Sequence, residues 1–193
     1  MSKGRLEAFS DGVIAIIITI MVLELKTPHG HDFSDIVPIL PVFLAYLLSF
    51  VFVGIYWNNH HHLFQVVKHI NGQVLWANLH LLFWLSIIPF VTSWLGESGL
   101  QAVPIAFYGA VCWVAGLAYY ILVRVLVGIH APDSPLVKAV GKDRKGLLSL
   151  ILYTTAIPLA FVASWAALGL IVLVALMWFI PDRRIARQST HDA

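Results

Sequence analysis

The first long apolar segment of the chain, from about residue 4 to residue 25, constrains the fold most. It begins with charged and polar residues and continues as an aliphatic run that only Thr19 interrupts. At a rise of about 1.5 Å per residue, a helix of roughly 20 residues crosses a hydrocarbon core of about 30 Å. Asp11 lies within this predicted span, where an unpaired carboxylate costs about 2.5–3.5 kcal/mol. Other helices must therefore supply polar partners for Asp11.

The composition extends this interpretation to the whole chain. Hydrophobic residues make up 60% of the 193 residues and charged residues 11%, whereas soluble domains average about half apolar and a quarter charged. The sequence therefore predicts an all-α, polytopic membrane protein with a single domain. Pro89 predicts a kink in the third span. Six spans are expected, over residues 4–25, 37–67, 74–95, 103–127, 147–163 and 166–180.

The basic residues predict the topology. The last apolar stretch, residues 147–180, is too long for one untilted helix, and basic residues flank both of its ends. Because Lys and Arg gather on the cytoplasmic side of a membrane, the chain crosses twice here, and we expect a tight turn between Ser164 and Gly169. Six spans then give cytoplasmic N- and C-termini, with Lys26 alone on the outer side. The other basic residues fall on the cytoplasmic side: Lys3, Arg5, Lys68, Arg124, Lys138, Lys142, Arg144, Lys145, Arg183, Arg184 and Arg187.

Polar side chains of the first three spans lie at a similar depth in the membrane. Asp11 is about seven residues, or roughly 10 Å, inside the start of its helix. The candidate partners from the second and third spans are His60, His61, His62, Trp76, Asn78 and His80. Intramembrane ionisable groups usually pair with one another. We therefore expect one or two of the histidines, and an indole or amide N–H, to hydrogen-bond Ser10 and Asp11.

This polar cluster can serve only to hold helices together, or it can bind a proton or a metal ion. Three consecutive histidines point about 100° apart around a helix, so His60–His62 cannot supply the i, i+4 ligand pair of a helical zinc site. A metal site across helices, formed by Asp11, His62 and His80, remains an alternative, although no metal site is expected.

The first span also carries a candidate pore-lining stripe. Gly12, Ile16, Thr19 and Leu23 share one side of a helix with 3.6 residues per turn. Helix packing alone can explain such a stripe, with the Thr19 hydroxyl bonded to a carbonyl of its own helix. An aliphatic ring can equally gate a pore by excluding water.

The residues Arg5, Phe9, Ser10 and Asp11 form the pattern R-x-x-x-F-S-D at the start of the first span. This pattern is similar to the signature of the transmembrane protein 175 family of potassium channels, and the chain resembles a single-repeat prokaryotic member. The resemblance implies that these four residues hold the first helix against its neighbours. It also implies a homotetramer in which four first helices line the pore, without a TVGYG-type filter.

The resemblance further assigns roles along the stripe. It places the hydrophobic constriction at Ile16, a hydroxyl linked to selectivity at Thr19, and further apolar layers at Ile20 and Leu23. In one departure from some relatives, Ala15 offers no side-chain hydroxyl before the constriction.

Together these features predict a potassium-permeable, weakly selective leak channel of the inner (plasma) membrane. We expect no enzymatic activity, no cofactor besides the permeant potassium ion, and no nucleic-acid partner; the expected partners are further copies of the chain and lipid. One alternative is a proton channel or proton-coupled transporter that uses Asp11 and the buried histidines. A less favoured alternative is a membrane enzyme with a histidine-bound metal.

Overall fold

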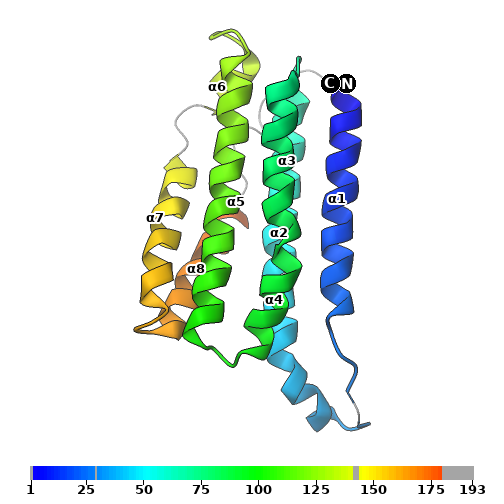
Figure 1. The fold of residues 1–193 in the computed structure, drawn as a ribbon, viewed down its shortest axis with the longest axis vertical. Coiled ribbons are helices and arrows are strands. Elements are labelled where there is room, and N and C mark those ends of the chain that lie inside the picture. The colour runs from blue at the N-terminus through cyan, green and yellow to red at the C-terminus, as the bar shows by residue number, and fades with distance from the viewer. Residues whose placement is uncertain (1, 29, 141–143, 180–193) are drawn as a thin grey trace.

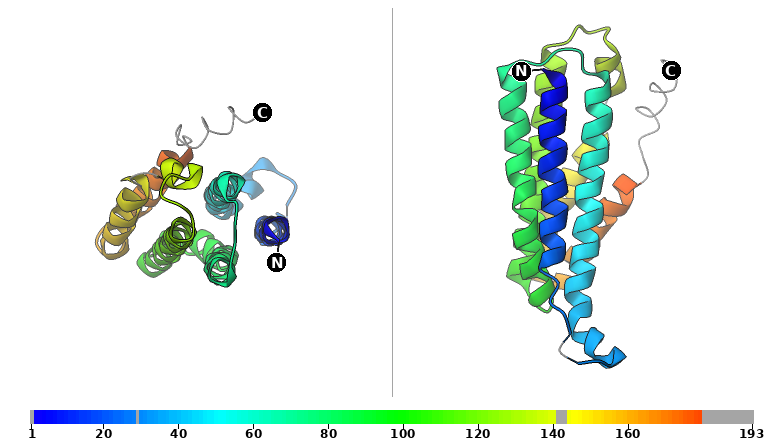
Figure 2. Two further views of the ribbon diagram at one scale, coloured as in Figure 1. Left: turned by 90° about the horizontal axis from the view of Figure 1, so that it is seen from above. Right: turned by 90° about the vertical axis from the view of Figure 1, so that its right-hand side faces the viewer.

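The computed structural model describes residues 2–28, 30–140 and 144–179, and this part of the chain is helical, without strands. Long helices lie side by side in a bundle, with α1 at one edge and the α7–α8 pair at the other (Figures 1 and 2). The elements are α1 (Lys3–Leu23), the 3-10 helix η1 (Phe33–Ile39), α2 (Leu40–Val66), α3 (Gly72–Ser86), α4 (Ile88–Glu97), α5 (Ala102–Gly128), α6 (Pro135–Val140), α7 (Arg144–Leu159) and α8 (Ser164–Phe179).

The helices confirm the membrane class of the chain. Four segments are long and apolar enough to cross a bilayer: α1, η1 with α2, α3 with α4, and α5. The apolar helices α7 and α8 are shorter in the part of the chain that the structure describes, and they pack against each other. The count of six crossings and the orientation of the termini stay predictions.

The predicted kink at Pro89 is confirmed, because the third span consists of two helices that meet at Ile87. A proline lacks the N–H that would bond the carbonyl four residues earlier, here that of Leu85, and its ring crowds that carbonyl. The Ile87 N–H instead closes the end of α3 with a bond to the Trp84 carbonyl (3.3 Å).

The turn predicted between Ser164 and Gly169 is wrong, because α7 ends at Leu159 and α8 already begins at Ser164. Pro158 lies in the last turn of α7, and the N–H groups of the following residues bond back to the end of that helix. Ala163, for example, donates to the Leu159 carbonyl (2.8 Å). These bonds provide partners for the last carbonyl groups of α7, and the chain has reversed its direction before Ser164.

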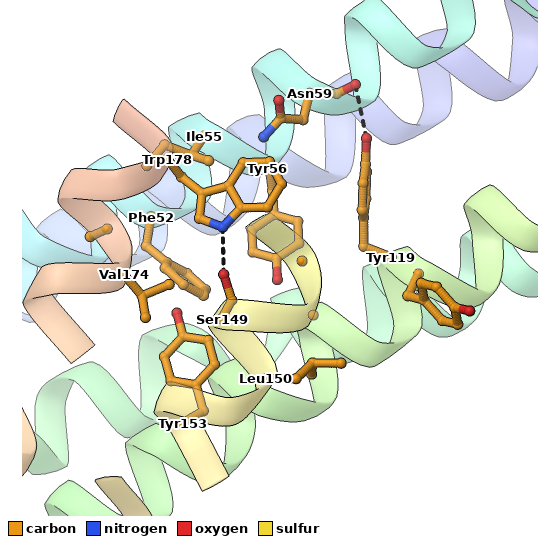
Figure 3. Close-up of a pocket in the computed structure, with 14 residues that line it drawn as sticks. Phe52, Ile55, Tyr56, Asn59, Tyr119, Ser149, Leu150, Tyr153, Val174 and Trp178 are labelled. Carbon is orange, nitrogen blue, oxygen red and sulfur yellow. Dashed lines mark hydrogen bonds between the residues drawn. The ribbon is translucent and has the colours of Figure 1, made fainter. Parts of the chain in front are cut away.

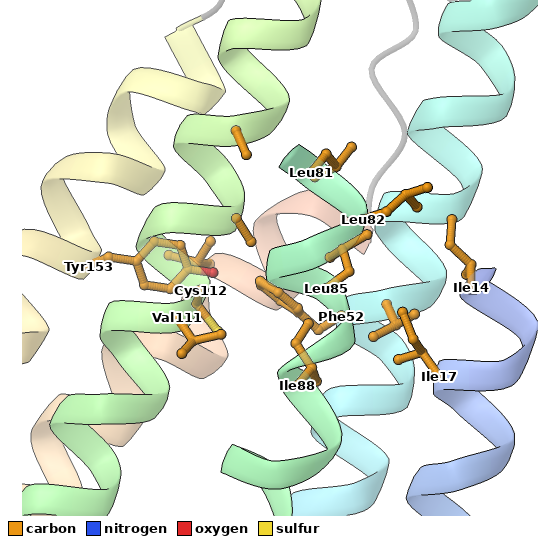
Figure 4. Close-up of a cluster of buried hydrophobic side chains, with 14 of the residues drawn as sticks. Ile14, Ile17, Phe52, Leu81, Leu82, Leu85, Ile88, Val111, Cys112 and Tyr153 are labelled. Atoms are coloured by element: carbon orange, nitrogen blue, oxygen red, sulfur yellow. The ribbon is translucent and has the colours of Figure 1, made fainter. Parts of the chain in front are cut away.

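The core of the bundle lies around α5, which packs against α3, α4, α7 and α8. Figure 4 shows buried side chains from α1, α2, α3, α4, α5 and α7 meeting in one apolar cluster. Buried hydroxyls of Ser49, Thr92 and Tyr108 also join α2, α4 and α5, with 2.7 Å from Thr92 to Ser49 and 2.9 Å from Ser49 to Tyr108. The close approach of α2 and α4 needs Gly96, because a Cβ there would lie 2.7 Å from the Cα of Val42.

The end of the bundle where the chain starts is uppermost in Figure 1 and is called the N-terminal end below. Lys3, at the start of α1, donates there to the carbonyl of Val67, which follows α2 (3.1 Å). Lys26 lies at the opposite end and forms an ion pair with Glu97 (2.9 Å). The hydrogen bond and charge of that carboxylate raise the pKa of Lys26 above 10.5. Lys142, Arg183, Arg184 and Arg187, which also entered the topology prediction, lie outside the described residues.

Candidate functional site

Helix α1 has one face toward the bundle and one face away from it. Leu6, Ser10, Ile14, Ile17 and Met21 are buried, and α1 packs against α2, α3 and α4. At about 100° per residue these positions fall on one side of the helix. Figure 2 shows α1 at the edge of the bundle, so its other side meets no helix of the described part of the protomer.

The candidate pore stripe lies on this outward face. Gly12 and Thr19 are exposed, as is Ile20 beside them, and the exposed fractions of Ile16 and Leu23 are 58% and 80%. The stripe is therefore not part of the core of the protomer. The Thr19 hydroxyl donates to the Ile16 carbonyl (2.9 Å), which leaves the lone pairs of its oxygen free to accept.

Beside the stripe, α1 and the α3–α4 segment enclose an open groove of about 500 Å³. Ile16 and Ile20 line it from α1, and Phe90 lines it from α4. Glu24 lies at the end of the groove away from the N-terminal end, where its Oε2 accepts from the Ser93 hydroxyl at 3.4 Å. The exposed face of α1 therefore has the Glu24 carboxylate at its C-terminal end.

A chain of buried hydrogen bonds, here called the polar relay, holds the inward face of α1 against α2 and α3. The His60 Nε2 lies 2.8 Å from the Asn78 Oδ1, which accepts its hydrogen. The Asn78 amide then donates to the Ser10 hydroxyl (2.9 Å), and Ser10 donates to the Leu6 carbonyl (2.9 Å). Every member of the relay has a partner, which a buried polar network needs in order to stabilise a fold.

Asp11 is held by a different side chain on α2. The Trp57 indole N–H donates to the Asp11 Oδ1 (3.0 Å), and the Trp57 ring stacks on His61 with ring centroids 5.9 Å apart. Gln65, one turn further along α2, hydrogen-bonds His61 (2.9 Å) and His62 (3.4 Å). This set, Asp11 with Trp57, His61, His62 and Gln65, is called the α2 ladder below. Asp11, Trp57, His61 and Gln65 are exposed in the protomer.

The expectation that a histidine bonds Ser10 or Asp11 directly is wrong for the described residues. The Asn78 side chain bonds both His60 and Ser10, so these two do not bond each other. The Asp11 carboxylate accepts its hydrogen bond from Trp57. The predicted indole and amide donors do exist, but the indole is that of Trp57. Trp76 instead points away from the cluster, with 74% of its surface exposed.

The remaining predicted residues lie apart from the relay. His80 accepts from the Trp84 indole within α3 (3.0 Å). Arg5 and Phe9 are exposed on the outward face of α1. Among the described residues no three His, Cys, Asp or Glu side chains are placed to hold a metal ion, so Asp11, His62 and His80 do not form the metal site considered above.

Sequence reasoning missed Trp57 and Gln65. Their spacing could have indicated them, because Trp57, His61 and Gln65 lie at i, i+4 and i+8 on α2. Residues with this spacing share one face of a helix.

Comparisons with known proteins agree with this architecture. The family described as endosomal/lysosomal potassium channel TMEM175 matches residues 5–89, which include the whole of α1 beyond Gly4 and the polar relay. A protein of Chryseobacterium sp. (strain P1-3), named a potassium channel, is 54% identical over 192 residues and covers 100% of both chains. A part of the mouse protein named endosomal/lysosomal proton channel TMEM175 is 36% identical over 101 residues, covering 46% of this chain and 20% of the mouse protein.

A solved structure has the same fold. The crystal structure of a lysosomal potassium-selective channel TMEM175 homolog from Chamaesiphon minutus superposes with a TM-score of 0.80 and 29% sequence identity. The match covers 92% of this chain and 96% of that one. Near-complete coverage at 54% identity, together with the shared fold, shows that this chain belongs to the TMEM175 family of ion channels.

Proposed function

We propose that the protein is a potassium-permeable, weakly selective leak channel, located in the inner membrane of a bacterium. The outward face of α1 carries the proposal. It is apolar around Ile16, lacks a side chain at Gly12, offers a hydroxyl oxygen at Thr19 and ends beside the carboxylate of Glu24. The names of the bacterial relatives support potassium as the permeant ion.

The pore forms between copies of the chain, because a single α1 cannot enclose a path. In a homotetramer with α1 of each protomer at the axis, four Ile16 side chains make a narrow apolar ring that limits hydration of the passing ion. The Thr19 hydroxyl donates its hydrogen to a carbonyl of its own helix, so the lone pairs of its oxygen can coordinate a cation. Glu24, near one mouth, raises the local cation concentration. Ile20 and Leu23 add further apolar layers.

The α2 ladder supports assembly into an oligomer. Asp11 and His61 are exposed in the protomer, and both fall within the spans predicted from the sequence, where the surrounding medium would be hydrocarbon. Ionisable side chains within a membrane normally face a bundle interior or a water-filled cavity. A neighbouring protomer, or the pore itself, would provide that environment.

Replacing Ile16 by Asn tests the constriction. The polar side chain should increase potassium flux into liposomes and reduce the preference for potassium over sodium, because the ring becomes wettable. Val22→Asn is a matched control, since Val22 is also exposed on α1 but lies roughly 120° around the helix from Ile16. This control should leave both quantities unchanged.

The assay is read on protein whose oligomeric state matches that of the wild type by size-exclusion chromatography with light scattering. Unchanged flux and selectivity in Ile16→Asn would remove Ile16 from the pore. An equal effect of Val22→Asn would mean that any polar residue on α1 perturbs the channel, and the stripe would lose its role.

Proton conduction is a second candidate, favoured by the exposed Asp11 and by the mouse relative, which is named a proton channel. It predicts that a pH gradient alone drives flux and that Asp11→Asn abolishes this flux. Potassium flux without any proton flux in the same liposomes would exclude it.

A further inference from the structure

A cavity lies inside the protomer between α2, α5, α7 and α8, away from α1 and its polar relay. Its volume is about 60 Å³. Most of its lining is aromatic or aliphatic, including Phe52, Leu150 and Val174 (Figure 3). No side chain that lines it carries a charge. The space is therefore poorly suited to an ion.

The cavity nevertheless contains hydrogen-bonding groups that lack partners. Tyr153 is only 2% exposed, and its hydroxyl has no hydrogen-bond partner. The Tyr56 hydroxyl and the Asn59 side-chain amide line the same space, and neither bonds to any part of the chain that the structure describes. Tyr56 and Asn59 are half-buried, whereas the Tyr153 hydroxyl is fully buried. Leaving a buried hydroxyl unpaired is costly, and native structures rarely do so.

Ser149 adds a fourth group. Its oxygen accepts from the Trp178 indole N–H (2.7 Å), and its hydroxyl donates to the Lys145 carbonyl (2.8 Å). A hydroxyl oxygen has two lone pairs, so one of them remains available. Figure 3 shows Ser149 between the rings of Tyr56 and Tyr153 at this cavity. Polar groups from two helices, α2 and α7, thus face one small space.

We propose that this cavity binds one or two water molecules that join Tyr153 on α7 to Tyr56 and Asn59 on α2. One water occupies about 30 Å³ of liquid and needs two to four polar partners, and the site meets both conditions. An apolar guest would leave the tyrosine hydroxyls unpaired. The water adds a link between α7 and α2 beside the direct hydrogen bond that joins α5 to α7, from the Trp113 indole N–H to the Thr154 hydroxyl (3.0 Å).

The proposal is tested by whether Tyr153→Phe raises or lowers the melting temperature of the protein. If water bridges the Tyr153 hydroxyl, Tyr153→Phe removes a satisfied hydrogen bond and lowers the melting temperature in detergent by about 2–4 °C. If the cavity is dry, the same change removes an unpaired buried hydroxyl and raises the melting temperature. Tyr120→Phe is the control, because Tyr120 lines the cavity but has 44% of its surface exposed, and the variant should melt like the wild type.

A structural measurement decides the matter even if Tyr153→Phe fails to fold. A high-resolution map of the wild-type channel should show density within hydrogen-bond distance of the Tyr153 hydroxyl, and crystals under xenon pressure should take up no xenon there. A cavity that lacks such density and binds xenon is dry. That result, or a raised melting temperature of Tyr153→Phe, would overturn the proposal.

Discussion

Replacing Asn78 by Ala should loosen α1 more than any other single change in the polar relay. Asn78 is 2% exposed and is the only relay member bonded to both Ser10 and His60. The substitution leaves the His60 ring N–H unpaired and removes one donor from Ser10, whose own hydrogen still reaches the Leu6 carbonyl. An unpaired buried group costs about 1–3 kcal/mol and a lost hydrogen bond about 1 kcal/mol. The expected loss of stability is therefore about 2–4 kcal/mol.

The measurement is thermal unfolding of the purified protein in detergent, followed by intrinsic tryptophan fluorescence. For a chain of this length, about 1 kcal/mol corresponds to roughly 2–4 °C, so Asn78→Ala should melt about 10 °C lower. Asn58→Ala is the matched control, because Asn58 is half-buried on α2 and its side chain bonds to no described residue. A shift below about 2 °C for Asn78→Ala, or an equal shift for both variants, would refute the relay as the anchor of α1.

Two other substitutions test neighbouring contacts. Trp57→Phe keeps an aromatic ring beside His61 but removes the N–H that donates to Asp11 (3.0 Å). The melting temperature should therefore fall by about 2–4 °C; no change would show that the indole N–H contributes nothing to stability. Gly96→Ala places a Cβ 2.7 Å from the Cα of Val42 and should cost about 1–3 kcal/mol in denaturant unfolding because α2 and α4 must separate. Gly54→Ala, whose Cβ would meet nothing within 4 Å, is the control and should not destabilise; equal costs would exclude the close approach as the cause.

The features that the sequence predicted best have local causes. The break before Pro89 follows from one missing N–H group, and the long apolar segments follow from composition alone. The turn after Leu159 was missed because the residues on both sides are apolar or small, so hydrophobicity gives no boundary. Only the backbone hydrogen bonds of the folded chain reveal that the reversal is complete before Ser164.

The polar cluster was predicted as a set of residues but not as a set of bonds. Depth in the membrane brings Ser10, Asn78 and His60 to one level, and this could be read from their positions. Which side chain touches which depends on how each helix is rotated about its axis, and a shared depth says nothing about that. For this reason Trp76 was expected in the cluster, whereas Trp57 is the residue that donates to Asp11.

The way in which α1 is fastened limits how it can move. Asn78 bonds Ser10 and Trp57 bonds Asp11, and these two positions lie about 100° apart around the helix. Rotating α1 about its axis would therefore break both hydrogen bonds at once. Toward Leu23 the helix is held mainly by apolar contacts such as those of Met21, which tolerate sliding. A swing of the far half about a fixed pivot therefore costs less than a rotation, and it would widen or narrow whatever space adjoins Ile16 and Thr19 without disturbing the pivot.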